Sequence, residues 1–185
     1  MKPALLALLL ASATTAGAGT WHAGQGDVRA TCVMTIGGSF DAKTTALNAA
    51  LTVGTSSSPA LDGSVVVDLR TLDTGISLRN EHLREKYLEV DKGPDYGQAV
   101  LSEIVLKGLS PDSPTGKGSF TASLTLHGVK NAVTGTVDAH PAGDGLRVKA
   151  SFPVNLLDYG IPKPRYLGVG VKNIVQVEVA FAATR

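Results

Sequence analysis

The sequence predicts an all-β domain in which eight antiparallel strands close into a barrel, with one short helix. Segments of alternating apolar and polar residues carry this prediction, because a period of two is typical of strands with one buried face. Turn clusters, rich in the chain's 21 glycines, separate these segments at short intervals. Sequential strands without crossover helices favour antiparallel pairing, and about eight of them can close so that no edge stays unpaired.

The clearest strand runs from Ser119 to Leu126, where phenylalanine, alanine and leucine alternate with serine and threonine. The C-terminal segment Val175 to Phe181 alternates as regularly, with Gln176 and Glu178 on the polar face. The remaining predicted strands are Val28–Ile36, Leu47–Val53, Ser64–Leu69, Gln98–Lys107, Val129–Val137 and Leu146–Phe152.

One segment departs from the strand pattern. Between Asn80 and Val90, the apolar residues Leu83, Tyr87 and Val90 recur at helical spacing. Asn80 is a suitable N-cap, and Gly93 with the proline after it lies beyond the end. We therefore expect one helix of about three turns, bounded by two strands.

The N-terminus has the layout of a secretory leader. Lys2 is followed by an apolar run and then by Ala16-Gly17-Ala18, which fits the pattern of signal peptidase sites. The apolar run is shorter than the roughly 20 residues of a transmembrane helix. We expect residues 1–18 to be a cleaved signal peptide, residues 19–185 to be the barrel domain, and the protein to be periplasmic or secreted.

Charge and cysteine content narrow the classes of partner. The chain has 17 basic and 16 acidic residues, which become balanced once Lys2 is removed. This balance favours neither nucleic acid nor an anionic membrane surface as a partner. Stable membrane insertion is not expected either. Cys32 is the single cysteine, so no internal disulfide forms, and its alternation with Ala30 and Met34 predicts an inert buried thiol.

No motif of catalysis or metal binding is recognisable. Gly108-Leu109-Ser110-Pro111-Asp112 lacks the last glycine of a nucleophile elbow. Gly168-Val169-Gly170 lacks the third glycine of a dinucleotide fingerprint. The four histidines show no metal-ligand spacing, and His127 beside Gly128 is interpreted as a turn residue. We expect no catalytic residue, no metal and no cofactor.

Three motifs resemble those of the YceI-like family of bacterial exported proteins. Leu72-Asp73-Thr74 followed by Arg79-Asn80-Glu81-His82-Leu83-Arg84 is similar to the family's strand end and helix start, with Tyr87-Leu88 after it. Ser123 to Lys130 resembles its strand and turn, and Asn155 to Ile161 its late turn. The resemblance covers roughly Val28 to the C-terminus. The chain lacks the family's opening His-Ser and F-x-x-x-H strand, and Leu156 replaces the usual arginine.

The resemblance implies an extended lipocalin-like barrel with its helix near the mouth, which binds a polyisoprenoid, an isoprenoid quinone or a similar amphiphilic lipid without catalysis. Transport, storage or sequestration in the cell envelope would follow, and a homodimer is compatible with it. Strand alternation and the family match select the expected ligand-binding residues. For the lining these are Val65, Val67, Leu69, Leu124, Leu126, Val148, Phe152, Val177 and Val179; for the mouth they are His82, Arg84 and Tyr159.

Three alternatives stay open at this stage. A scavenger of diverse hydrophobic molecules would differ from a lipid carrier only in the width of the mouth and in selectivity. An enzyme on the same scaffold would bring His82, Arg84 and Asp158 together at the mouth. A structural or interaction domain would have a filled core. The choice of the inward face is itself a hypothesis, because a shift of one residue reverses it.

Overall fold

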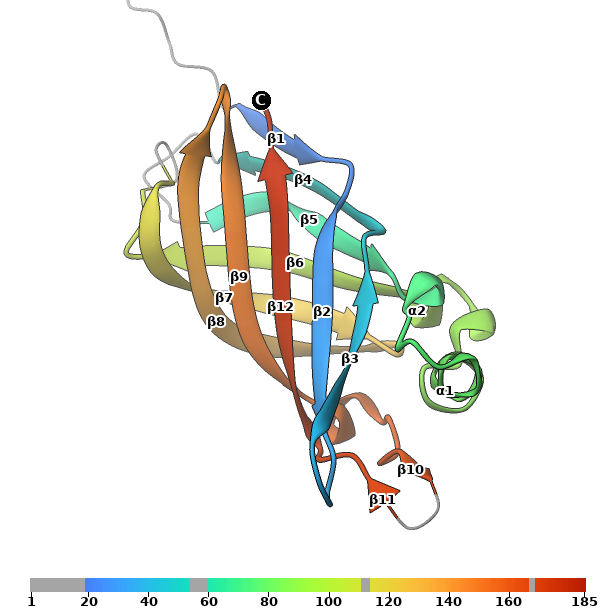
Figure 1. Ribbon diagram of the computed structural model, residues 1–185. Helices are drawn as coiled ribbons and strands as arrows, with labels where there is room; N and C mark the ends of the chain where they lie inside the picture. The colour runs from blue at the N-terminus through green and yellow to red at the C-terminus, as the bar shows by residue number, and fades with distance from the viewer. Residues whose placement is uncertain (1–18, 54–59, 111–113, 167–168) are drawn as a thin grey trace, which may run out of the picture.

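The computed structural model describes residues 19–53, 60–110, 114–166 and 169–185. The predicted signal peptide therefore lies outside the described residues. Ten strands form one antiparallel sheet in the order β1-β4-β5-β6-β7-β8-β9-β12-β2-β3 (Figure 1). They are β1 (Thr20–Ala23), β2 (Gly26–Val33), β3 (Ser39–Thr44), β4 (Leu47–Val53), β5 (Ala60–Asp68), β6 (Gln98–Lys107), β7 (Gly116–Leu126), β8 (Val129–Ala142), β9 (Gly145–Asn155) and β12 (Ile174–Ala183).

The first four strands are a single bent hairpin. β1 pairs with β4, and β2 pairs with β3, in the same register, which runs from Thr20↔Thr52 to Val33↔Ser39. The pairing is interrupted only where the chain bends after Ala23. β2 also pairs with β12, and His22 exchanges two backbone hydrogen bonds with Thr184. The hairpin therefore joins β12 to β5 and closes the sheet into a barrel.

The all-β antiparallel barrel of the sequence prediction is confirmed. Its strand count differs, because β1 and β3 were not expected as separate strands. If β1 with β2, and β3 with β4, are each counted as one bent strand, the ten strands of the sheet become eight. β1 is too short to show alternation, and Asp41 and Lys43 give β3 the polar character of a loop.

Several strand boundaries also differ from the prediction. β2 ends at Val33 rather than Ile36, before the turn at Gly37 and Gly38, both of which have positive φ. β5 begins at Ala60, because a bulge at Gly63 (φ 101°) allows the chain to continue as a strand through a glycine. Leu69 lies just beyond β5, in a 3₁₀ turn (Leu69–Thr71).

The helical segment begins three residues earlier than predicted. Helix α1 (Ser77–His82) continues into the π-helical turn η2 (Leu83–Tyr87), followed by a 3₁₀ turn (Val90–Lys92) and the short α2 (Pro94–Gly97). Asn80 is not the N-cap: its side chain accepts from the Thr74 backbone N–H at 2.8 Å and donates to Asp73 at 2.6 Å. It therefore holds the loop that precedes the helix.

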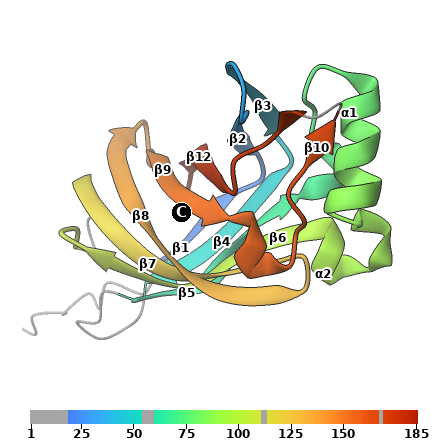
Figure 2. The ribbon, with the colours of Figure 1, turned by 90° about the horizontal axis from the view of Figure 1, so that it is seen from below.

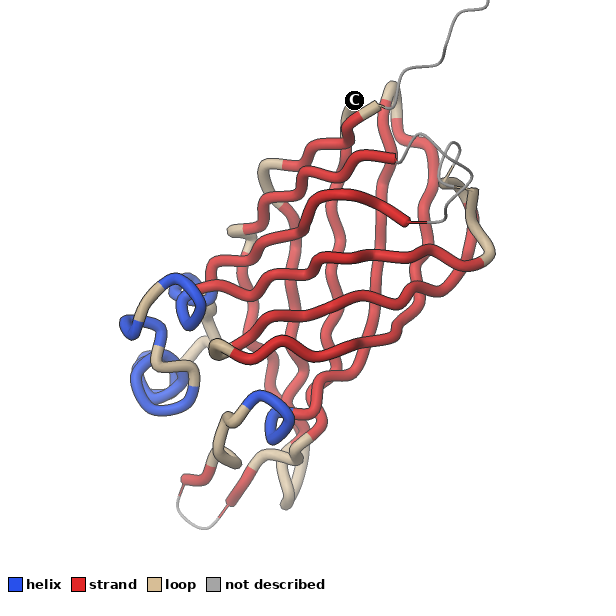
Figure 3. Tube along the Cα trace, turned by 180° about the vertical axis from the view of Figure 1, so that it is seen from behind, coloured by secondary structure: helices blue, strands red, loops and turns tan. Residues whose placement is uncertain are grey.

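These helices gather at one end of the barrel, here called the helical end, and the C-terminus lies at the other (Figures 1 and 3). A 3₁₀ turn (Leu156–Tyr159) and the hairpin of β10 (Arg165–Tyr166) and β11 (Val169–Gly170) lie at the same helical end. Seen from below, β10 lies beside the helical segment (Figure 2), where the Tyr87 hydroxyl accepts from the Arg165 N–H at 3.1 Å. Within the described residues, no helix has the length and apolar character to cross a bilayer.

The turn between β7 and β8 fixes α2 to the barrel. His127 and Gly128 both have positive φ, in agreement with the turn role predicted for His127. The His127 ring lies 3.0 Å from the Tyr159 carbonyl and 3.0 Å from the Glu89 carboxylate, and it packs edge-on against Tyr96. Lys92, and after it His127, hold the pKa of Glu89 below its usual range.

A glycine in β8 makes room for an aromatic contact in the interior. Gly135 pairs with Phe120 of β7, and a Cβ at this glycine would lie 2.7 Å from the Phe120 ring and 2.5 Å from the Ser151 carbonyl oxygen. Phe120 in turn packs edge-on against Phe152 of β9, at 5.8 Å between ring centroids. The glycine is therefore required where the Phe120 ring lies over the neighbouring strand β8.

We expect Gly135→Ala to lower the free energy of unfolding by about 1–3 kcal/mol, the usual cost of overpacking. Urea denaturation followed by circular dichroism measures this. Thr134→Ala, on the outer face of the same strand, is the control and should change stability by less than about 0.5 kcal/mol. Equal stability of the two variants would contradict the steric role of Gly135.

Candidate functional site

The interior of the barrel is hollow. A cavity of about 740 Å³ extends from the helical segment to Leu51, Leu61 and Leu106 in the far half of the sheet. A volume of this size is typical of small-molecule sites and far exceeds the packing voids of ordinary cores. The cavity opens at the helical end, where its lining includes Ile36, Ile76 and Leu78, each about half or more exposed.

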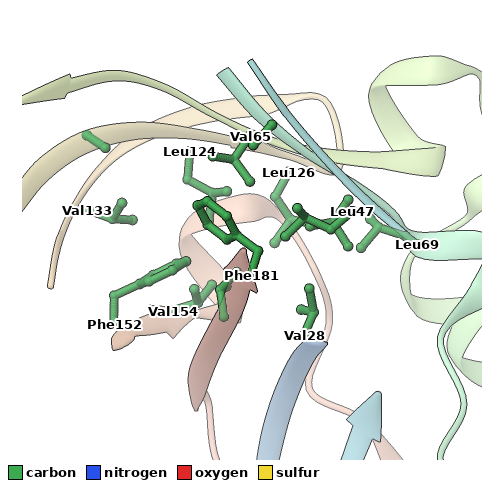
Figure 4. Packing of buried hydrophobic residues seen from close by; sticks show 14 of the residues in the cluster. Val28, Leu47, Val65, Leu69, Leu124, Leu126, Val133, Phe152, Val154 and Phe181 are labelled. Carbon is green, nitrogen blue, oxygen red and sulfur yellow. The ribbon is translucent and has the colours of Figure 1, made fainter. Parts of the chain in front are cut away.

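Strand alternation explains the apolar lining. On β5, Val65 and Val67 face the cavity while Val66 does not, and on β7 Leu124 and Leu126 face it. Adjacent strands place their inward residues at the same level, so that Val65, Leu101 and Leu124 are successive partners across three strands. Figure 4 shows side chains from several strands directed into this common interior.

All nine residues selected for the lining face the cavity: Val65, Val67, Leu69, Leu124, Leu126, Val148, Phe152, Val177 and Val179. The face of each strand that was predicted to point inwards is therefore the face that lines the cavity. That these side chains contact a ligand stays a prediction.

Sequence reasoning missed much of the lining from the bent hairpin and β6. Val28, Ala30, Cys32, Phe40, Ala42, Leu101 and Ile104 also line the cavity. Alternation of Ala30, Cys32 and Met34 was a usable signal for β2. In β3 the charged outward residues concealed it, because alternation with Asp41 and Lys43 looks like a surface loop.

The Cys32 thiol faces the cavity from β2. Burial, and after it the nearby Asp41 carboxylate, raises its pKa to about 11. The thiol is therefore protonated at neutral pH and is a poor nucleophile.

The polar residues of the lining are concentrated at the opening. We call this region the mouth and define it by Ile36, Ile76, Leu78, Arg79, His82 and Arg165. The described lining contains two arginines and one histidine but no aspartate or glutamate. Arg79 lies over the Phe40 ring, 4.1 Å from its centroid, which directs this guanidinium towards the inner wall.

Of the three predicted mouth residues, His82 alone lines the cavity. Arg84 follows the inward-facing Leu83 and points elsewhere: it donates to the Leu72 carbonyl at 2.9 Å and so fixes the loop that precedes α1. Tyr159 is 2% exposed and packs in the core behind the lining. The choice of Arg84 and Tyr159 as mouth residues thus disagrees with the geometry, and Arg79 and Arg165 occupy those places.

The side chains considered for catalysis do not meet at the cavity. His82 lines it, whereas Asp158 accepts a hydrogen bond from Asn155 at 2.8 Å and, like Arg84, is not part of the lining. Among the described residues, no group of three or more histidine, cysteine or acidic side chains lies close enough to hold a metal.

Comparison with known proteins identifies the family. The family model described as YceI-like domain matches residues 16–183. The chain belongs to the YceI-like family. A comparison with curated proteins found no match.

Solved structures share the fold of this YceI-like domain. A polyisoprenoid binding domain from Saccharophagus degradans is 15% identical, with a TM-score of 0.64, covering 89% of this chain and 97% of that one. Burkholderia cenocepacia BcnA is 18% identical, with a TM-score of 0.65 and coverages of 85% and 96%. The Campylobacter jejuni YCEI protein is 14% identical, with a TM-score of 0.52 and coverages of 75% and 81%.

The Tyr159 hydroxyl is buried without a hydrogen-bond partner among the described residues, and burial raises its pKa. Tyr159→Phe removes this unsatisfied group, so we expect the free energy of unfolding to stay equal or rise by up to about 1 kcal/mol. Urea denaturation measures this, together with the amount of bound ligand, which should not change.

The matched control is Tyr87→Phe, which removes a hydroxyl that is hydrogen-bonded to Arg165. This variant should be less stable than the wild type by about 0.5–1.5 kcal/mol. Loss of ligand in Tyr159→Phe with stability retained would instead assign Tyr159 to the mouth.

Proposed function

We propose that this YceI-like domain binds a long apolar molecule in the barrel and performs no chemistry on it. The observation that carries the proposal is the cavity of about 740 Å³ with a predominantly apolar lining, open at one end. A hollow apolar interior gives up packing contacts that a solid core would have, and a ligand restores them. The filled-core alternative from the sequence does not agree with this cavity.

The distribution of polar groups indicates how such a ligand lies. Towards Leu51, Leu61 and Leu106 the lining offers aliphatic groups, so the apolar chain occupies the inner part. Each methylene removed from water contributes about 0.8 kcal/mol. About ten of them yield on the order of 8 kcal/mol before ordering costs are subtracted. The polar end of the ligand stays at the mouth, near Arg79 and His82.

Family membership and one structural neighbour support the ligand class. The Saccharophagus degradans neighbour is described as a polyisoprenoid binding domain. We therefore propose a polyisoprenoid, an isoprenoid quinone or a similar amphiphilic lipid, carried, stored or sequestered in the cell envelope.

A scavenger of varied hydrophobic molecules is the second candidate. It is favoured by the scarcity of polar groups in the lining, because these are the groups that would fix the orientation of one particular ligand. Competition between prenyl chains and unrelated lipophiles of equal size separates the two: a carrier prefers the prenyl chains, whereas a scavenger binds both alike.

A location in the envelope requires export, and residues 1–18 have the sequence of a leader. We expect the exported protein to begin at Gly19, since cleavage follows Ala16-Gly17-Ala18. Intact-mass measurement of protein from an exporting bacterial host tests this. Charged residues at both positions, Ala16→Asp with Ala18→Asp, should leave the leader attached. Recovery of wild-type protein that begins at Met1 would contradict export by cleavage.

The decisive test of binding is mass spectrometry of organic extracts from the purified protein. We expect a long apolar molecule in the wild type and little in Val67→Asp, because a carboxylate in the cavity would be desolvated by the ligand. Val66→Asp places the same charge on the neighbouring outward position and should retain the ligand.

A second variant tests binding independently, in case Val67→Asp does not fold. Ala150→Trp fills part of the cavity with an apolar side chain, so it should exclude the ligand while the domain stays folded. Extracts without any apolar molecule, from folded wild type that also takes up no added prenyl lipid, would refute the proposal.

A further inference from the structure

Large apolar side chains are exposed mainly around the mouth. Ile36 is 70% exposed, and Ile76 and Leu78 are each close to half exposed. Ile174 (59%) and Val33 (37%) lie on the adjoining ends of β12 and β2, outside the cavity lining. Single exposed apolar residues are ordinary, but a group at the opening of an apolar cavity indicates a contact surface.

Three segments form this surface, which we call the rim: residues 33–38, residues 74–79, and the described residues 161–166 with 169–174. Backbone contacts join the first and the third, because the Thr35 N–H donates to the Gly170 carbonyl at 2.7 Å and the Lys172 N–H to the Val33 carbonyl at 2.8 Å. Arg79 of the second segment lies over Phe40, just after the first. The three segments project from the helical end of the barrel (Figures 1 and 2).

The rim is the basic part of a nearly neutral chain. Its sequence contains Arg79, Lys163, Arg165 and Lys172 and no aspartate or glutamate, although the whole chain has a formal net charge of +1. In the described part of the chain, the ion pairs involve other basic residues, and none of these four pairs with a carboxylate. Lys163, Arg165 and Lys172 are therefore available to an external anion, whereas Arg79 lies over Phe40 at the inner edge of the rim.

We propose that the rim docks on the surface of an anionic lipid bilayer. The exposed isoleucine and leucine side chains would enter the interfacial region, and Lys163, Arg165 and Lys172 would lie at the level of the lipid phosphates, which is the arrangement of interfacial membrane binders. The apolar rim continues into the cavity lining through Ile36, Ile76 and Leu78. A lipid can then move between bilayer and cavity without its chain crossing water.

Charge argues for a bilayer over a second copy of the chain. A dimer formed rim to rim would oppose three outward cations with three outward cations, which is unfavourable at close distance. An anionic bilayer complements them. Transfer of a lipid rests on the proposed ligand binding, whereas docking itself does not, so the two can fail separately.

Cosedimentation with vesicles tests docking. The probes are phosphatidylcholine vesicles with about one third phosphatidylglycerol, and vesicles of phosphatidylcholine alone. We expect the purified protein to bind the anionic vesicles and to be released as the salt concentration approaches about 0.5 M, since salt screens exposed charges. Lys163→Glu with Lys172→Glu should weaken binding by roughly tenfold or more, because both charges are reversed at the anionic surface.

The apolar contribution has its own variant and controls. Ile174→Ser, which leaves the cavity lining unchanged, should weaken binding several-fold, because it removes a side chain from the interface. Lys117→Glu with Lys149→Glu makes the same charge change outside the rim, and Val129→Ser removes an exposed valine outside it. These controls should bind vesicles like the wild type.

Absence of vesicle binding by the wild type would overturn the proposal, as would equal losses in rim and control variants. A dimer seen by sedimentation velocity and dissociated by the rim variants would assign the rim to a second copy and would also overturn it. Ligand content is measured on the same samples. Docking lost with ligand retained, as expected for the rim variants, leaves the proposed function untouched.

Discussion

Closure of the sheet by the bent hairpin is the constraint on which the rest of the molecule depends. β1 pairs with β4 and meets the end of β12 through His22 and Thr184, while β2 pairs with β12 and β3. Two sides of the sheet are joined in this way by backbone hydrogen bonds, so their donors and acceptors are satisfied inside the protein. Once the sheet is closed, alternation directs every second side chain into one shared interior.

The composition of that interior explains why it is hollow. Phe120 and Phe152 meet over β8, where Gly135 provides the space, but elsewhere the inward residues are mainly alanine, valine and leucine. Such side chains are too short to meet at the centre of a barrel of this size. The empty space costs packing energy, which the closed hydrogen-bonded sheet tolerates and a bound apolar molecule recovers. Stability of the sheet and capacity for a ligand are thus supplied by different groups.

Features with a period of two could be predicted from the sequence, whereas features that depend on helical phase or on a bend could not. Nine lining residues were selected correctly for their inward direction because alternation fixes a whole strand at once. Arg79 and Arg84 belong to the same short motif, yet Arg79 faces the cavity and Arg84 the Leu72 carbonyl. The directions of these two side chains differ because the helix starts at Ser77. The sequence prediction, which used Asn80 as the N-cap, placed this start too late. Likewise, the bend between β1 and β2 is set by pairing with distant strands rather than by local sequence.

The helical segment is attached to the barrel mainly at its two ends. Its start is held by polar contacts among Asp73, Thr74 and Asn80, and its end by the buried Leu88 and Val90. α1 itself, between these attachments, contains no buried residue. Segments with few buried apolar contacts open at lower free energy than core strands do. In the proposed function, a ligand would therefore enter past α1, which has no buried residue, and the hydrogen bonds that close the sheet would not need to break.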